Sequence, residues 1–267
     1  KRLKNERLGN LIQFFDEPRR IASISFNKLL WGFEHPYGRP NIGTEKSIKG
    51  FDRNTVMQIY KTYFKANNAQ IVVVGDINKK DLKEVLEKYF SKWEKGKIPE
   101  TKFVKKEAPN KTTIYIVDKP GSAQTVIYVG TIGVGRNTKD YTAISVMNTI
   151  LGGSFTSKLN DNLREKHGYT YGARSFFSHR KETGYFAATA SVQTEVTDSA
   201  LYQFFYEFGE IKKPLSDEDL TKGKNYLALS YPSNFATVSD VQNQLTDLVL
   251  NNLPLNYFNS FVTDVLK

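Results

Sequence analysis

Apolar residues recur every three or four positions over residues 3–34, which is the spacing of a helix rather than of a strand. The pattern is interrupted near Pro18, so it predicts two consecutive helices. Residues 35–40 contain two prolines and a glycine, and these must end the second helix. Residues 41–49 show no periodicity and are expected to form a loop.

Two amphipathic helices and a short strand are predicted next. Asp52 is a good N-cap for one helix and Asp81 begins another, which closes near Trp93. Between them, residues 69–76 form a β-branched run that ends in glycine, which favours a buried strand. Residues 94–111 are polar and contain two prolines and six lysines, so they are the best linker candidate.

The remaining residues predict a strand-rich centre followed by helices. Strands are expected at residues 112–117, 124–130, 169–177 and 184–193, the last two forming a hairpin. A helix over residues 141–151 ends at a double glycine, and Ser154 is expected to cap a second helix that runs to about Lys166. The segment from Asp198 to the last residue is expected to be helical. This mixture indicates an α+β fold.

A weak internal repeat relates the first and last parts of the chain. In both, a helix, a short break and a second helix precede a proline turn, at Pro36 and at Pro254, about 217 residues apart. A single repeat at that distance indicates two homologous halves rather than a solenoid. Because the second copy stops before any counterpart of residues 71–76, and because the chain opens within a helix, we expect truncation at both ends.

Composition narrows the possible classes of protein. The 267 residues carry a net charge of +10, but lysines alternate with acids, which is typical of solvated helix faces and argues against nucleic-acid binding. No apolar run is long enough to cross a bilayer. The absence of cysteine excludes disulfides and thiolate metal sites and leaves the compartment open. For a bacterial source, the periplasm or cell envelope is preferred.

The sequence offers no metal-binding motif. His35, His167 and His179 are too far apart in sequence to place two imidazoles on one helix face, so no zinc motif of the H-x-x-E-H type occurs. No nucleophile elbow and no phosphate-binding loop is present either. We therefore assign no metal ligand to this chain.

The most informative segment runs from Leu151 to Ala173. Arg164 is expected in the last turn of a helix that stops at Gly168, and Tyr171 follows on the next strand. A guanidinium and a phenol brought to one side of a groove could hold a peptide carbonyl or a developing oxyanion. The structural alternative is an arginine that offsets the helix dipole and a tyrosine half-buried in a sheet. The residues alone leave both readings open.

These residues nevertheless resemble a known family. The run L-R-E-x-x-G-x-x-Y from Leu163 to Tyr171, after the double glycine, is similar to the second half of M16 (pitrilysin/insulinase-like, inverzincin) peptidases. The segments 35–38, 68–76 and 214–216 resemble further elements of the family in the same order. The resemblance spans essentially the whole chain, and the combination of motifs is specific.

The resemblance implies a clamshell of two homologous halves of the LuxS/MPP-like type, each an antiparallel or mixed sheet covered by helices. Residues 1–100 would form the rear of the first half, residues 101–111 a linker, and residues 112–267 most of the second half. The family's arginine and tyrosine, which contact substrate near the scissile bond, correspond to Arg164 and Tyr171. His167, Gly152, Gly153 and Ser154 are secondary candidates for substrate contact.

One departure from the family favours a non-catalytic chain. Where an active first half has a glutamate ligand on the helix before the Asp16-Glu17-Pro18 segment, this sequence has Gly9 and Asn10, and the nearest carboxylate is Glu6. Zinc is then expected in a partner half or subunit, with which the chain would form a homo- or heterodimer. The chain would hold a peptide substrate but be inactive alone, so whether it is itself an enzyme stays undecided.

Two alternatives remain. The chain could be a fragment of a self-sufficient zinc peptidase whose H-x-x-E-H motif lies upstream of Lys1. It could instead be a structural or assembly homologue without proteolytic activity, although such a protein would need neither Arg164 nor Tyr171.

Overall fold

The computed structural model describes residues 1–100 and 104–267, so residues 101–103 of the predicted linker lie outside the described residues. The strands are β1 (Gln124–Val134), β2 (Thr170–His179) and β3 (Thr183–Gln193). Before the sheet come α1 (Arg2–Asp16), α2 (Pro18–Trp31), η1 (Pro36–Gly38), α3 (Glu45–Gly50), α4 (Arg53–Tyr63), η2 (Ala66–Asn68) and α5 (Lys79–Phe90). The other helical segments are α6 (Tyr141–Asn148), η3 (Thr149–Gly153), α7 (Lys158–Asn160), η4 (Asp161–Lys166), η5 (Thr194–Val196), α8 (Thr197–Glu210), α9 (Asp217–Ser230), η6 (Tyr231–Phe235), α10 (Val238–Asn251), η7 (Tyr257–Asn259) and α11 (Phe261–Leu266).

The three strands form one antiparallel sheet in the order β1-β3-β2. The α+β fold class and the β2–β3 hairpin predicted from the sequence are thus confirmed. On one face of the sheet, alternate strand residues such as Ala188 and Val192 meet Leu163 and Phe204 in the main hydrophobic core. All four of these side chains are shielded from solvent, because small strand residues let the helices approach closely.

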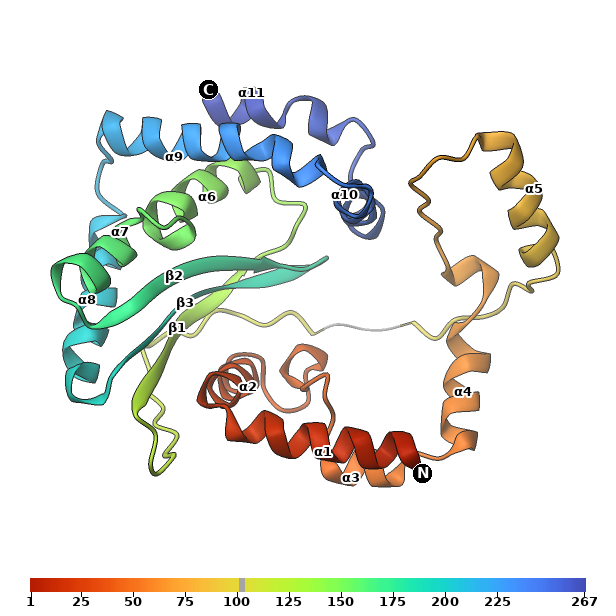
Figure 1. The fold of residues 1–267 in the computed structure, drawn as a ribbon, viewed down its shortest axis with the longest axis horizontal. Helices are drawn as coiled ribbons and strands as arrows, with labels where there is room; N and C mark the ends of the chain where they lie inside the picture. Colours follow the sequence, from red (N-terminus) through yellow and green to blue (C-terminus); the bar gives the residue numbers. More distant parts are fainter. Residues whose placement is uncertain (101–103) are drawn as a thin grey trace.

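Helix α2 covers the opposite face of the sheet. Its Phe26 ring lies 5.5 Å from Tyr128 of β1 and 5.6 Å from Tyr185 of β3, measured between ring centroids. Near the start of the helix, Arg19 Nε donates a 2.9 Å hydrogen bond to Ser191 Oγ. The sheet is therefore held between α1–α3 on one side and the helices that follow β1 on the other (Figure 1).

A second helical layer lies outside the first. Val146 and Ile150 pack with Val265 of α11, and α9 comes close to them at Gly223, where an added methyl would lie 2.6 Å from Ile150. The order helix, break, helix, turn and short helix is shared by α1–α3 and by α9–α11. This shared order agrees with the internal repeat in the sequence.

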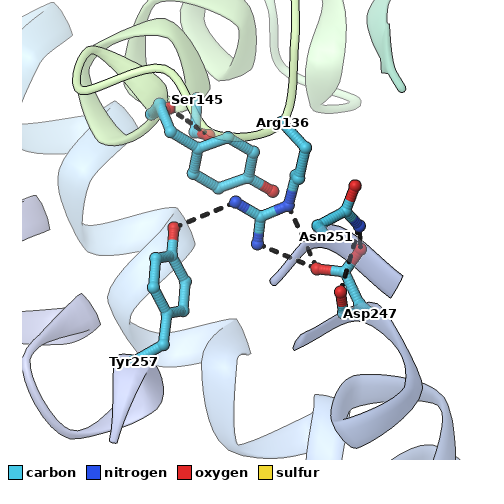
Figure 2. A network of polar contacts seen from close by, with 6 residues as sticks. Arg136, Ser145, Asp247, Asn251 and Tyr257 are labelled. Carbon is cyan, nitrogen blue, oxygen red and sulfur yellow. Dashed lines mark hydrogen bonds and ion pairs between the residues drawn. The ribbon is translucent and has the colours of Figure 1, made fainter. Parts of the chain in front are cut away.

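One polar cluster joins this outer layer to the end of β1. The buried guanidinium of Arg136 lies 2.9–3.0 Å from Asp247 of α10 and donates a 3.1 Å hydrogen bond to the Tyr257 hydroxyl (Figure 2). The same guanidinium stacks 3.8 Å above the Tyr141 ring, whose burial raises the pKa of its hydroxyl. Asn251 supports the carboxylate of Asp247 at 2.8 Å. The cluster fixes α10 and η7 against the sheet.

Several local expectations were wrong. Residues 41–49 are not all loop, because Thr44 and Ser47 form a capping box that starts α3 at Glu45. The segments 69–76 and 112–117 form no backbone pairing with another described strand, so they are extended chain rather than strands. Ile71 is 51% exposed and Ile116 is 90% exposed. High β-propensity produces a strand only when another strand lies alongside, and no described segment pairs with either run.

Candidate functional site

The chain reaches the candidate site through an irregular helical segment. The π-helical turn η3 leads through a short loop to α7, which continues as the π-helical η4 that carries Arg164. Gly168, at φ +65°, ends this segment, and its amide donates to Arg164 O at 3.1 Å. Tyr169 N then donates to Leu163 O at 2.9 Å, so the helix turns directly into β2. π-Helical turns are uncommon and occur frequently at functional sites.

Arg164 has an unused hydrogen-bond donor. Its guanidinium lies 4.4 Å above the ring of Phe155, and Nη1 is 3.0 Å from Glu165 Oε1. The contact with Glu165 is an ion pair without hydrogen-bond geometry, so Nη1 is buried with no hydrogen-bond acceptor among the described residues. A buried charged donor without an acceptor is costly, and such groups concentrate at sites that bind something.

Tyr171 projects into solvent because the edge strand is irregular at its start. The register of β2 against β3 shifts between Thr170 and Ala173, which is the signature of a β-bulge. The Thr170 hydroxyl closes the bulge by accepting from Gly172 N at 3.2 Å and donating to Ser191 O at 2.7 Å. Tyr171 is consequently 92% exposed. Bulges commonly redirect a side chain next to an active site.

The buried side chain of Asn160 connects these parts, and sequence reasoning missed it. Its Nδ2 donates to Phe155 O at 2.6 Å, and its Oδ1 accepts from Ala173 N at 3.1 Å. One amide thus holds the loop beneath Arg164, the helix that carries Arg164 and the strand that carries Tyr171. Phe155, 68% exposed, was also missed. Neither residue has a distinctive sequence signal, because each role depends on contacts across the fold.

Arg164 and Tyr171 therefore lie on adjoining elements. The η4 segment packs against β2, and the short turn at Gly168 connects η4 to β2. Within the described part of the chain, no hydrogen bond or ion pair links the two side chains to each other. Each can donate to an acceptor from outside, the guanidinium as a charged donor and the phenol as a neutral one.

The secondary candidates have different surroundings. Gly152 is buried against β2, where an added methyl would lie 2.4 Å from Ser175 N. Gly153 is exposed, yet a methyl there would lie 2.9 Å from Asn148 Nδ2. Ser154 does not cap the next helix as expected, because its hydroxyl donates back to Thr149 O at 3.2 Å and Ser157 is the N-cap residue. His167 is exposed and stacks 4.9 Å from the Tyr169 ring.

The histidines do not form a metal centre. His35 Nδ1 accepts a hydrogen bond from Tyr37 N, His167 stacks on Tyr169, and His179 Nδ1 lies 3.2 Å from Val134 O. Among residues 1–100 and 104–267, no group of three or more histidines and carboxylates is close enough to hold a metal ion. The described residues thus do not fit zinc.

None of the helices in the described part of the chain combines the length and the apolar character that spanning a bilayer requires.

A family model and curated relatives show which known proteins this chain is similar to. A family model described as the peptidase M16 inactive domain matches residues 50–227. An uncharacterized zinc protease, YmxG of Bacillus subtilis, is 28% identical over 185 residues, which cover 69% of this chain and 44% of that protein. A non-peptidase homolog, YmxG of Helicobacter pylori, is 24% identical over 271 residues, which cover 100% of this chain and 61% of that protein.

The solved structures agree with these relatives. The crystal structure of a peptidase M16 inactive domain from Pseudomonas fluorescens matches with a TM-score of 0.89 at 29% identity. The match covers 99% of this chain and 63% of that one. The chain accordingly spans less than two thirds of the length of these relatives.

Proposed function

The chain belongs to the peptidase M16 family, and we propose that it is the peptide-holding, non-zinc half or subunit of an M16 zinc metalloendopeptidase. The observation that carries this proposal is the guanidinium of Arg164, which has a buried donor without a hydrogen-bond acceptor, on the segment that leads directly into the strand of the strongly exposed Tyr171. The Arg164 side chain is 33% exposed, so a peptide carbonyl can accept from the N–H groups of the guanidinium that solvent reaches. The same two donors would stabilise the negative charge that develops on that oxygen during hydrolysis.

The division of labour between the halves follows from the chemistry of the side chains. Arginine and tyrosine can bind and polarise a carbonyl, but neither generates a nucleophile from water at neutral pH. A zinc-bearing half or subunit would supply the activated water. In this proposal the chain's own residues orient the peptide and compensate charge at the scissile bond.

The helix α1 supports a role without zinc. At the positions where the family's glutamate ligand would be expected, Gly9 and Asn10 offer no carboxylate, and both are exposed. The nearest carboxylate, Glu6, forms an ion pair with Arg2. The name non-peptidase homolog, given to the Helicobacter pylori relative that this chain matches over its whole length, is in keeping with this role.

An extended peptide has part of a strand edge on which to bind, because Asn160 and Asn148 already bond the Ala173 amide and the Ser175 carbonyl of β2. β2 is an outer strand of the sheet, and its bulge places Tyr171 beside that edge. We infer that a substrate would add to this edge by main-chain pairing, with Arg164 and Tyr171 at the reacting carbonyl. His167, Gly153 and Ser154 are the secondary contacts in this proposal, and Gly152 acts by letting η3 approach β2.

The proposed domain arrangement is the one that the family resemblance implies. Residues 1–100 would be the rear of a first half, residues 101–111 the linker and residues 112–267 most of a second half. The partner that completes the site would be a zinc-bearing M16 half or subunit. The repeated order of α1–α3 and α9–α11 supports two halves of common design.

The test is a reconstitution with a zinc-bearing M16 protein from the same organism. The purified chain is mixed with that protein, the complex is isolated by size exclusion, and hydrolysis of fluorescein-labelled casein is measured. We expect no hydrolysis by the chain alone and hydrolysis by the complex that a zinc chelator abolishes. Arg164→Ala and Tyr171→Phe should each lower kcat/KM by about 10²–10³ without changing complex formation.

Arg174→Ala is the matched control, because Arg174 is an exposed arginine on the same strand and should be dispensable. Chelator-sensitive hydrolysis by the chain alone would replace this proposal with a self-sufficient peptidase. Full activity of the complex with both Arg164→Ala and Tyr171→Phe would remove the peptide-holding role and favour a structural or assembly protein.

A further inference from the structure

A second candidate site lies between the helical segment 158–167 and α8. It is a pocket of about 490 Å³, within the size range of small-ligand sites. Neither Arg164 nor Tyr171 lines it, and of the proposed peptide contacts only His167 reaches it. Its lining includes two tyrosines and an unusual number of charged groups, and the balance of those charges indicates what the pocket can bind.

Glu207 provides a buried negative charge in this pocket. The residue is only 6% exposed, and its Oε1 accepts a 2.5 Å hydrogen bond from Asn162 Nδ2. No lysine, arginine or histidine of the described residues forms an ion pair with it, and Oε2 has no hydrogen-bond donor there. An unpaired buried carboxylate is costly to keep in a fold, so a cation that binds it would be favoured.

The neighbouring charges are already neutralised. Lys166 Nζ lies 2.9 Å from Asp161 Oδ2, and Lys158 Nζ lies 2.8 Å from Asp219 Oδ2. The third acid of the pocket, Glu210, pairs with Lys213 at 2.5 Å. Glu207 is therefore the one acid lining the pocket that forms no ion pair among the described residues, and the nearby Lys166 charge acts on it only from beyond ion-pair distance.

Asn162 contributes a second unsatisfied acceptor. It is 4% exposed and lines the same pocket, and its Nδ2 is shared between Glu207 and Gln203 Oε1 at 3.1 Å. Its Oδ1 accepts no hydrogen bond from the described residues. Each of these two adjacent buried side chains thus keeps one oxygen that accepts no hydrogen bond from the described residues, which points to a ligand that brings several N–H groups.

The rim of the pocket favours an organic cation over a metal ion. Tyr202 is 67% exposed and Tyr206 is 47% exposed, and their rings can stack on an ammonium or guanidinium group. The described residues offer no cluster of three carboxylate or imidazole ligands here. We propose that this pocket binds an alkylammonium or guanidinium group, with Glu207 as counter-ion and the tyrosines as its aromatic wall.

The cationic group could belong to a basic side chain of a peptide or to a small free amine, and the test separates these two sources. N-acetyl-arginine amide, N-acetyl-lysine amide and putrescine are titrated into the full chain by calorimetry, with N-acetyl-glutamine amide as the neutral comparison. We expect at least one cation to bind while the neutral amide does not. Preference for the amino-acid amides identifies a peptide side chain, and preference for putrescine identifies a free amine, either of which supports the proposal.

Glu207→Gln keeps the size of the side chain and an acceptor for Asn162 but removes the charge, and it should weaken binding by about 10- to 100-fold. Glu210→Gln is the matched control, because that acid lines the same pocket but is already paired. Should Glu207→Gln not fold, Tyr202→Leu decides instead, with an expected loss of about 2- to 5-fold. The proposal is overturned if no cation binds at millimolar concentration, or if the decisive variant binds like the wild type. Because the readout is binding, these outcomes are independent of peptide hydrolysis.

Discussion

Ala173 donates its backbone amide to the side-chain oxygen of Asn160 at 3.1 Å, and this bond joins the edge strand to the helical segment that carries Arg164. The register of β2 against β3 shifts between Thr170 and Ala173, so this bond lies next to the irregular part of the strand. The Asn160 side-chain amide also holds Phe155 O, which places the aromatic ring beneath the guanidinium. The relative positions of Arg164 and Tyr171 consequently depend on a residue that would touch no substrate.

Replacing Asn160 by alanine should therefore destabilise the protein. The variant loses two hydrogen bonds and leaves the Ala173 amide buried without an acceptor, so the unfolding free energy should fall by about 2–3 kcal/mol. Equilibrium unfolding in urea measures the change. Asn256→Ala is the control, because Asn256 is exposed and its side chain caps nothing, and it should stay within about 0.5 kcal/mol of wild type. Equal stabilities of the two variants would contradict the linking role of Asn160.

Gly152 tolerates no side chain because of close packing rather than backbone angle. A methyl group there would lie 2.4 Å from Ser175 N and 2.9 Å from Leu159 Cδ1, and the strand backbone cannot yield cheaply. Gly152→Ala should lower the unfolding free energy by about 1–3 kcal/mol in urea titrations. Gly209→Ala, in an open position on α8, should be neutral or should add up to about 1 kcal/mol. A neutral Gly152→Ala would show that η3 does not approach β2 this closely.

Replacing Arg136 should lower the stability of the protein strongly, because its guanidinium is buried among its partners. Arg136→Leu leaves Asp247 and the Tyr257 hydroxyl without their partner, and about 2–4 kcal/mol of stability should be lost. Part of this loss comes from the Asp247 carboxylate, which is left without a partner. The double variant Arg136→Leu/Asp247→Leu should regain that part of the stability. Hydrogen exchange should accelerate in α10 before it does in the sheet, because the cluster attaches that helix (Figure 2). Uniform acceleration throughout would argue against a local attachment.

His179 predicts a dependence of stability on pH. Burial lowers the pKa of the imidazole below its ordinary value of 6.5, and nearby Arg136 lowers it further, whereas the Val134 carbonyl and Asp247 oppose the shift. The unfolded chain therefore binds the proton more readily than the folded one. The stabilising contribution is complete at pH above 6.5 and declines as the pH falls through the unfolded pKa toward the lower folded one.

The measurement is the unfolding free energy between pH 7.5 and pH 5 for the wild type and two variants. His179→Phe retains stacking on Phe177 but cannot titrate, so it should lose less stability than the wild type on acidification. His167→Gln replaces an exposed histidine and should follow the wild-type profile. Parallel curves for the wild type and His179→Phe would exclude this histidine as the titrating group.

Local chemistry sufficed to predict most of the helices and the hairpin. The break at Pro18 and the cap at Asp52 are confirmed, since both depend on residues within one turn. The spacing of Leu163, Arg164, Gly168 and Tyr171, combined with the segments 35–38, 68–76 and 214–216, indicated the M16 family, to which the chain belongs. Periodicity, capping and motif spacing are properties of neighbouring residues, so the sequence displays them directly.

Only the tertiary structure decided the rest. The runs at 71–74 and 114–117 have the composition of strands, yet they remain exposed extended chain, because a strand also needs a neighbour at hydrogen-bonding distance. The bulge that exposes Tyr171, the Asn160 amide that supports it and the unpaired charge of Glu207 all arise between residues distant in sequence. Whether a buried polar group has a partner depends on how elements pack, and no single stretch of sequence contains that information.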